Sequence, residues 1–363
     1  MKENFSKWTK RALSIGLSAS IMVASVAMFS ACTKKSGEEP TSSDENSTTV
    51  QVASANNPLT GVSGFNQSAV GKRPYAIVVE NHPSARPQWG LCTPDIVLEG
   101  LVEGGISRML WLYADADSIP SKVGPVRSAR VDYVESAAAF DAIYVHWGGA
   151  TTEGMSAYDK IKQLGVNDID GLSHSTVYFG RDSSRASRGS EHTGYTTQEL
   201  IKKATTDFNY RTDLKDSYKN IFKFNSEKTA LPDAACTNVK TGFSNDYMHT
   251  FKYNESDGLY YNYMNSNPMK DENGKQMAVE NVLILFASYK VADSIGHVDY
   301  DLSGGTGYYI SNGTYQQIKW QKGNGGTEPF KFFTQSGEQL SMNPGKFWMG
   351  LVPNGMKSAT KLS

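Results

Sequence analysis

The segment RPYAIVVENHPSARPQWGLCTPDIVLEGLVEGGISRMLWLY, residues 73–113, determines the fold class that we expect for this chain. Residues 75–80 form a short apolar run, which is typical of a buried strand. Residues 93–95, Thr-Pro-Asp, resemble a helix start with a hydroxyl cap, a proline and an acid in the first turn. The apolar residues that follow predict a helix over residues 93–103, and residues 106–113 predict the next strand. The segment therefore predicts alternating strands and helices.

The same alternation continues along the first part of the chain. Residues 142–147 predict a strand, and helices are expected over residues 129–140, 151–164 and 196–208. Strands that alternate with helices are typical of a layered α/β domain. We assign residues 70–235 to this domain.

The second part of the chain has a different pattern. Short runs rich in Tyr, Phe, Ile and Val alternate with Asp-Gly, Asn-Gly and Gly-Gly steps, which favour hairpin turns. Residues 236–355 are therefore expected to form a mainly antiparallel β portion. The predicted fold class is α+β, with an N-terminal layered α/β domain followed by this C-terminal portion.

Composition excludes several classes of protein. The 363 residues include 36 basic and 37 acidic side chains, so the formal net charge is −1. Such a balance argues against a protein that binds nucleic acid through bulk electrostatics, and we expect no nucleic-acid partner. The ordinary share of hydrophobic residues, 39%, excludes wholesale disorder and a multi-span membrane protein.

The first 31 residues have the pattern of a secretory signal peptide. A basic head precedes the charge-free residues 12–31, and the small residues Ser30 and Ala31 stand directly before Cys32. This arrangement resembles a bacterial lipobox, in which a peptidase cuts before the cysteine and its sulfur carries a diacylglycerol. Phe29 occupies the position that Leu normally holds. We expect a lipid-anchored protein on the extracytoplasmic face of the cell membrane; the alternative is an uncleaved membrane anchor.

A flexible tether is expected over residues 32–69. Its first half is rich in Ser, Thr, Asn and Glu and contains no aromatic residue, so it cannot bury enough surface to offset chain entropy. Beyond Cys32, the chain has only Cys92 and Cys236. Outside the cytoplasm these two cysteines could form a disulfide, and two unpaired buried thiols are the alternative.

Familiar catalytic and cofactor motifs are missing from the sequence. It contains no G-x-x-x-x-G-K-[ST] loop, no H-E-x-x-H zinc helix, no G-x-S-x-G elbow and no S-x-x-K pair. We therefore expect no cofactor and no metal site.

Polar side chains gather beside the apolar runs of the N-terminal domain. Glu99 and Glu103 would share one face of the helix predicted there and would repel each other without cations nearby. Arginine forks pair with carboxylates through two hydrogen bonds, so the cluster is either a structural Arg–Glu network or an anion pocket with spare arginine donors. The candidate binding residues are Asn81, His82, Arg86, Glu99, Glu103, Arg108, Arg127, Arg130, His146 and Arg181.

One histidine and one loop stand out among these segments. His146 lies at the end of a predicted strand, beside two glycines, and is the best candidate for a functional histidine. Residues 181–192 form a polar loop, which is either a solvated surface loop or a lid over the pocket.

Several long segments resemble the YerB-like bacterial lipoprotein family. They are NHPSARPQWGL, DIVLEGLVEGGISRMLWLY, VGPVRSARVDYVESAAAFDAIYVHWGGA, FGRDSSR and LSMNPGKFWMGLVP, and together they cover residues 71–353. The resemblance implies an extracytoplasmic lipoprotein with an α/β part followed by a β-rich part. It implies no established activity. Family members tend to have an R-x-A-P-H-N-like segment where residues 185–192 of this chain read RASRGSEH.

Two functions remain open at this point. The first is a non-enzymatic lipoprotein whose arginine-rich groove binds an acidic small molecule, a wall glycan or an envelope protein. The alternative is a hydrolase or transferase on envelope polymers, with Glu99 or Glu103 as acid or base and His146 assisting. An open cleft shared by a carboxylate and His146 would support catalysis, whereas burial and full pairing of these groups would argue against it.

Overall fold

The computed structural model describes residues 55–363, all of which belong to one compact unit. The signal peptide, Cys32 and most of the predicted tether lie outside the described residues. Within residues 55–363, no helix is both long and apolar enough to cross a membrane.

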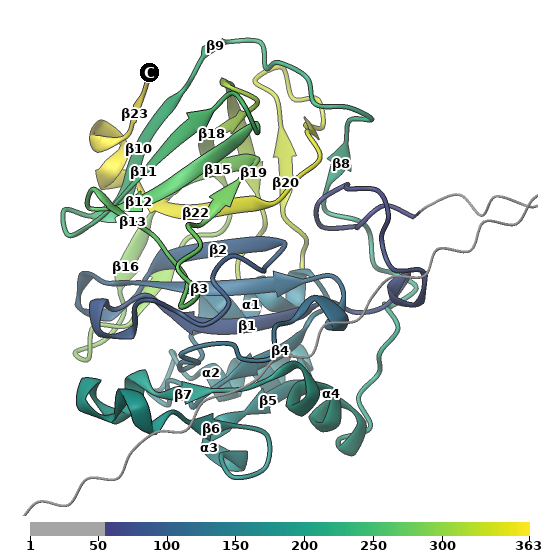
Figure 1. Ribbon diagram of the computed structural model, residues 1–363, viewed down its shortest axis with the longest axis vertical. Helices are drawn as coiled ribbons and strands as arrows, with labels where there is room; N and C mark the ends of the chain where they lie inside the picture. Colours follow the sequence, from purple (N-terminus) through teal and green to yellow (C-terminus); the bar gives the residue numbers. More distant parts are fainter. Residues whose placement is uncertain (1–54) are drawn as a thin grey trace, which may run out of the picture. The chain divides into compact units, whose positions relative to one another are not determined.

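A mixed central sheet runs through both parts of the chain (Figure 1). Its strand order is β20 (Lys331–Phe333), β19 (Thr314–Gln321), β18 (Gly305–Ser311), β15 (Asn281–Ala287), β22 (Phe347–Pro353), β2 (Ile96–Leu101), β3 (Ser107–Tyr113), β1 (Tyr75–Glu80), β4 (Ile143–His146) and β5 (Asp168–Asp170). The short β9 (Ala234–Ala235) pairs with β19. Strand β22 lies parallel to both β15 and β2, so the last long strand of the chain joins the two parts.

Helices pack on both faces of the N-terminal part of this sheet. They are α1 (Val131–Ala139), α2 (Ala157–Leu164), α3 (Gly171–His174) and α4 (Gln198–Asp207). The hydroxyl of Tyr133 on α1 donates to the carbonyl oxygens of Gly100 and Arg108, which fixes the helix across β2 and β3. Ser156 caps α2 and Thr197 caps α4, because each side chain accepts a hydrogen bond from a backbone N–H of the first turn.

A second sheet packs against the face of the central sheet that lies opposite α1. Its order is β13 (Asn267–Pro268), β12 (Leu259–Met264), β11 (Tyr247–Asn254), β10 (Asn238–Ser244) and β23 (Lys361–Leu362), with β14 (Ala278–Val279) beside β12. Phe243 and Phe251 lie against the ring of Trp348 from β22, at centroid distances of 6.0 and 4.9 Å. Burial alternates strictly along β12, as expected for a strand with one face on the core.

Shorter elements complete the fold. Three two-stranded sheets pair β16 (Tyr289–Val291) with β17 (Val298–Tyr300), β21 (Ser341–Met342) with β8 (Lys223–Phe224), and β6 (Gly180–Arg181) with β7 (Gly194–Tyr195). The 3-10 turns are η1 (Gln67–Ala69), η2 (Pro83–Ala85), η3 (Glu103–Gly105), η4 (Ala116–Ser118), η5 (Ser183–Arg188), η6 (Ser190–His192) and η7 (Asn354–Ala359).

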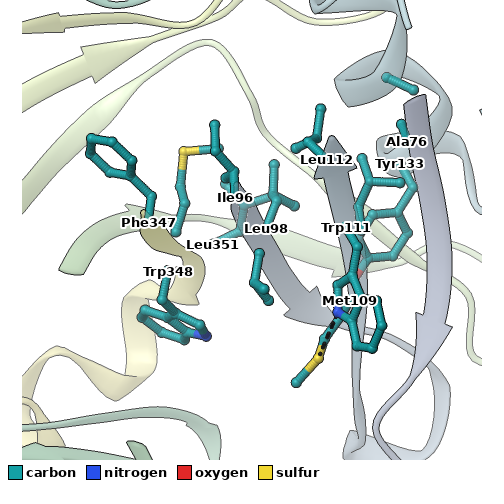
Figure 2. Close-up of a cluster of buried hydrophobic side chains, with 14 of the residues drawn as sticks. Ala76, Ile96, Leu98, Met109, Trp111, Leu112, Tyr133, Phe347, Trp348 and Leu351 are labelled. Atoms are coloured by element: carbon teal, nitrogen blue, oxygen red, sulfur yellow. Dashed lines mark hydrogen bonds between the residues drawn. The ribbon is translucent and has the colours of Figure 1, made fainter. Parts of the chain in front are cut away.

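The core centres on the strands where the two parts meet. Figure 2 shows Trp111 beside Met109 and Leu98 beside Leu351, and these four side chains and that of Trp348 are buried. The indole N–H of Trp111 donates to the sulfur of Met109 at 3.4 Å. Each fully buried side chain of this size stabilises the fold by roughly 1.5–3 kcal/mol, so this region holds β2, β3 and β22 together.

The predicted α+β class is confirmed, but the helix predicted over residues 93–103 is wrong. Residues 96–101 form strand β2, which lies between β3 and β22 and is buried on both faces. The residues that resembled a helix cap have other partners: the Thr93 hydroxyl donates to the carbonyl of Gly90, and Asp95 accepts from the Ala114 N–H. Glu99 and Glu103 therefore do not share a helical face.

The other elements confirm or refine the expectations. The helices predicted over residues 129–140 and 196–208 correspond to α1 and α4, whereas α2 begins six residues after the predicted start at 151. Strand β10 was not predicted. Cys92 and Cys236 are both free thiols in the structure.

Candidate anion-binding site

The central sheet divides the predicted cluster into two groups. Directly opposed residues of neighbouring strands share a face, and successive residues alternate. Glu80 of β1 is opposite Arg108 of β3, on the face that carries α1. Glu99 is opposite Met109, on the face that packs against the second sheet. One network between all the predicted residues is therefore excluded.

The first group surrounds Glu99, whose side chain is completely buried. Its carboxylate accepts hydrogen bonds from Asn81 Nδ2 at 2.8 Å, from Trp348 Nε1 at 2.8 Å and from the Ser107 hydroxyl. Nε2 of His249 lies 3.2 Å from the same carboxylate. Burial alone would raise the pKa of Glu99, but the charge and hydrogen bond of His249, with the other donors, hold that pKa below its usual value.

Arg86 completes this first group. It donates from Nε to the side-chain oxygen of Asn81 at 3.0 Å and from Nη2 to the Asn81 carbonyl at 2.7 Å. The Asn81 amide in turn donates to Glu99, so each member has a protein partner. Within this group the side chains bind one another, but Arg86 binds Asn81 and forms no ion pair with Glu99 in the described part of the chain. His249, which contacts both Glu99 and Asn262, was not predicted.

The second group lies where β1 and β4 separate. The two strands pair in parallel up to Ile77 and Val145, and residues 126–129 fill the gap beyond that point. The Arg127 N–H donates to the carbonyl of Val78 at 3.0 Å, and the Trp147 N–H donates to the carbonyl of Arg127 at 3.0 Å. We call residues 126–129 the arginine arch.

A hollow of about 320 Å³ opens between the arginine arch and the loops that follow β4 and β5. We call it the arginine hollow; its lining residues are Val126, Arg127, Ser128, Trp147, Gly148, Gly149, Leu172, Arg181, Ser190 and Glu191. The carboxyl ends of parallel strands are where open α/β sheets bind their ligands. The position of the hollow therefore fits a binding site.

Arg127 and Arg181 reach this hollow with unused hydrogen-bond donors. Arg127 donates from Nη1 to the Glu191 carbonyl at 3.3 Å, and its Nη2 has no partner among residues 55–363. Arg181 donates from Nη1 to the Ser190 carbonyl and lies over the ring of Trp147 at 4.4 Å, which leaves its Nε and Nη2 without partners in that range. A guanidinium has five N–H donors, so both retain capacity for an anion.

Glu80 and two histidines support Arg127 from behind. Oε1 of Glu80 lies 3.3 Å from Nε of Arg127, and Oε2 lies 2.8 Å from Nδ1 of His192. The ring of His82 stacks on that of His192 at 5.0 Å. Burial, followed by the positive charge of His192, lowers the pKa of His82, so this ring is neutral and its Nδ1 accepts from the Ser84 N–H.

Three further predicted residues are placed around the hollow without lining it. Arg130 forms an ion pair with Glu103, whose carboxylate also lies 3.3 Å from Nε2 of His297. Burial opposes ionisation of Glu103, but Arg130 outweighs it and lowers the pKa of that carboxyl. Arg108 is buried and donates to the carbonyl of Ser128 at 2.9 Å.

His146 lies beneath the floor of the hollow and is completely buried. Its Nδ1 donates to the carbonyl of Gly148 at 2.8 Å, and its Nε2 lies 3.0 Å from Oδ2 of Asp168. His146 therefore fixes the backbone of Gly148, which lines the hollow. His146 shares no open cleft with Glu99 or Glu103, so the geometry that would have supported a Glu/His catalytic site is not present.

The polar loop over residues 181–192 is anchored at its middle. Arg185 is buried, lies 3.7 Å over the ring of Trp89 and donates to the carbonyl of Pro87 at 2.7 Å. It also pairs with Glu272 of the C-terminal part. These contacts fix the loop as one wall of the hollow and argue against a freely moving lid.

The fold and the hollow define a two-part α+β protein with an arginine-lined site at the carboxyl ends of its parallel strands. Residues 59–211 match the family model described as "Protein of unknown function (DUF3048) N-terminal domain", and residues 239–349 match the model of its C-terminal domain. The chain belongs to this family.

Two comparisons with known proteins agree with the family. The chain is 34% identical over 303 residues to "Putative lipoprotein YerB" of Bacillus subtilis strain 168, a match that covers 82% of this chain and 86% of the relative. It is also similar to the crystal structure of the YerB protein from Bacillus subtilis, with a TM-score of 0.73 and 32% identity, over 85% of this chain and 99% of that one. The resemblance predicted from the sequence is confirmed.

Proposed function

We propose that this chain is a lipoprotein that Cys32 anchors to the extracytoplasmic face of the bacterial membrane, and that it binds an anionic ligand in the arginine hollow. The lipobox pattern of the sequence and the name of the Bacillus subtilis relative support the anchor. Two or more acyl chains hold a protein stably at a membrane, whereas a single chain does not. The ligands within reach are acidic small molecules, wall glycans and envelope proteins.

The observation that carries the binding proposal is the pair of arginines with unused donors. Arg127 and Arg181 approach one hollow from different walls, and among the residues that line it only Glu191 bears a negative charge. Arginine forks bind carboxylates and phosphates through paired, charge-assisted hydrogen bonds. A ligand with such a group would find both charge and directed donors.

The anchor is tested in growing cells. Radiolabelled palmitate is expected to enter the wild-type protein and not the Cys32→Ser variant, and external protease is expected to degrade the wild-type protein on intact bacteria. A protein that stays unlabelled and protected would contradict the proposed anchor.

The binding site is tested with the chain from residue 33 to 363. Calorimetric titration with inorganic phosphate, acetate and soluble wall fragments is expected to detect binding of at least one anion. Arg127→Gln combined with Arg181→Gln is expected to abolish that binding. Arg188→Gln is the control, because Arg188 lies in the same loop, donates to the carbonyl of Arg86 and does not line the hollow. Equal binding by all variants would place the ligand elsewhere.

A further inference from the structure

Arg108 is a buried cation with too few partners. Arg108 is only 3% exposed, and within the described residues its side chain makes one hydrogen bond, from Nη1 to the carbonyl of Ser128 at 2.9 Å. No carboxylate within residues 55–363 forms an ion pair with it. Buried charges in folded proteins are normally paired and fully hydrogen-bonded, so this position needs an explanation.

The surroundings of Arg108 add positive charge instead of removing it. Burial, followed by the like charges of Arg130 and Arg127, lowers the pKa of Arg108 to about 10. The Glu103 carboxylate attracts Arg108 from a greater distance, but its ion pair is with Arg130. Arg108 therefore has no ion pair of its own within residues 55–363, because Glu80 pairs with Arg127 and His192 and Glu103 pairs with Arg130.

Two more buried polar atoms at this place have no hydrogen-bond partner. They are Nε of Arg127, which forms an ion pair with Glu80 at 3.3 Å without hydrogen-bond geometry, and the hydroxyl of Tyr144. Within the described part of the chain, Oε1 of Gln88 is the other buried side-chain atom without a hydrogen bond. Tyr144 lies close enough to Arg108 and Arg130 for both to lower its pKa against the raising effect of burial. Buried polar groups without a hydrogen bond are costly, so each of them needs a structural or functional explanation.

We propose that the arginine hollow binds the phosphate group of a phosphate ester, and that Arg108 is a positioning residue of this binding site. Arg108 holds the carbonyl of Ser128, which lines the hollow, and supplies uncompensated positive charge directly behind it. This inference rests on the proposed function and specifies its ligand.

The geometry favours phosphate over carboxylate. A planar carboxylate presents two oxygens in one plane, and a single guanidinium fork can engage both of them. A phosphate group presents oxygens in several directions, so Arg127 from the arch and Arg181 from the loop can each engage a different pair. Arg127, Arg181 and Arg108 also outnumber the two nearby carboxylates, Glu191 of the lining and Glu80 behind Arg127, so the hollow keeps positive charge for an anion.

The proposed phosphate-binding site is tested by titrating the chain from residue 33 to 363 with inorganic phosphate, glycerol 3-phosphate and acetate. We expect the phosphates to bind at least about tenfold more tightly than acetate, in keeping with the strength of bidentate pairing. Equal affinity for acetate would overturn the phosphate assignment while leaving anion binding intact. Binding of none of these anions, nor of wall fragments, would overturn the proposed function itself.

Vesicles distinguish the two sources of a phosphate ester. Co-sedimentation with phosphatidylglycerol vesicles and not with phosphatidylcholine vesicles, lost in the Arg127→Gln/Arg181→Gln variant, would assign a lipid headgroup. Binding of glycerol 3-phosphate without such co-sedimentation would assign a free phosphate ester.

The role of Arg108 is tested by Arg108→Met. Replacement of an unmatched buried charge by an apolar side chain of similar length is neutral or stabilising. We therefore expect an unchanged or higher melting temperature together with about tenfold weaker phosphate binding, because a charge in a low-dielectric interior acts over several ångströms. A lower melting temperature with unchanged phosphate affinity would make Arg108 purely structural.

A second variant keeps the proposal testable if Arg108→Met does not fold. Arg108→Lys keeps the charge but loses the planar fork, so phosphate affinity is expected to lie between those of the wild type and Arg108→Met. If Arg108→Lys binds phosphate no better than a folded Arg108→Met variant, the proposed contribution of its charge is wrong.

Discussion

Nε2 of His249 lies 3.2 Å from Oε1 of Glu99, and both side chains are completely buried. Glu99 belongs to β2 in the N-terminal part, and His249 belongs to β11 in the second sheet. Their contact spans 150 residues of sequence. The pair therefore links the two parts through a buried charge interaction in addition to the shared sheet.

Removal of one partner of this pair is expected to destabilise the protein strongly. Glu99→Gln leaves His249 without a counter-charge and places an amide among several donors. Breaking a buried pair in this way costs about 3–5 kcal/mol, and urea unfolding should show that loss. Glu191→Gln, at an exposed carboxylate, is the control and should stay within about 0.5 kcal/mol of the wild type.

The double variant measures the interaction energy between Glu99 and His249 apart from the cost of each single substitution. With Glu99→Gln and His249→Gln together, no unpaired charge remains, so the total loss should be smaller than the sum of the two single losses. Strict additivity would show that the two side chains do not interact energetically.

The lowered pKa of Glu99 also predicts that the protein loses stability in acid. Its folded-state pKa is lower than the ordinary value, so its contribution is complete above about pH 4.5 and disappears as the pH falls below that value through the folded pKa. Urea unfolding midpoints between pH 3 and pH 7 should fall steeply at the acidic end. In Glu99→Gln this part of the decline should be reduced, and an identical pH profile would assign the acid lability to other groups.

The sequence was informative where local pattern and tertiary position agree. The apolar run of residues 75–80 and the helices α1 and α4 were predicted correctly because each carries a local pattern, although only α4 has a side-chain cap. Residues 93–103 failed because a strand buried on both faces has no alternation, so its pattern cannot be told from that of a buried helix. The insertion of β22 between β15 and β2 is a long-range pairing that no local pattern encodes.

The candidate site shows the same division. Arg127 and Arg181 were predicted and do line the hollow, because arginines beside glycine-rich strand ends are a local feature. Glu99 was assigned to the same cluster, but strand register turns it to the opposite face. His249 was missed, although Tyr247, His249 and Phe251 alternate as buried positions along β11, and a histidine on that apolar face indicates a buried partner.

The thiol of Cys92 is expected to react slowly with alkylating reagents in the folded protein. Burial, followed by the nearby Asp271, raises its pKa to about 12, and its Sγ donates to the carbonyl of Lys275 at 3.4 Å. The thiolate is the reactive form, so alkylation at pH 8 should be roughly a thousandfold slower than for an ordinary cysteine. Iodoacetamide labelling of the Cys236→Ser variant of residues 33–363, with and without urea, measures this ratio. Equal rates in both conditions would contradict the buried environment.

Asp132 should respond to pH in the direction opposite to Glu99. It lies in the first turn of α1, it is buried, and its oxygens accept from the Tyr300 N–H at 3.2 and 3.4 Å. Burial, followed by the negative charges of Asp299 and Glu135, raises its pKa well above the usual value. Its contribution to stability is therefore complete below about pH 3.9 and is lost as the pH rises towards the folded pKa.

Asp132→Asn removes the ionisable group and keeps an oxygen that can accept from the Tyr300 N–H. At pH 7 the free energy of unfolding should rise by about 1 kcal/mol, the typical size of one relieved buried polar group. The gain should shrink as the pH falls towards 4, because wild-type Asp132 then becomes neutral as well. Asp117→Asn, at an exposed carboxylate, provides the comparison. A destabilised Asp132→Asn variant at pH 7 would mean that the ionised carboxylate stabilises α1, because negative charge at a helix N-terminus is favourable when it remains solvated.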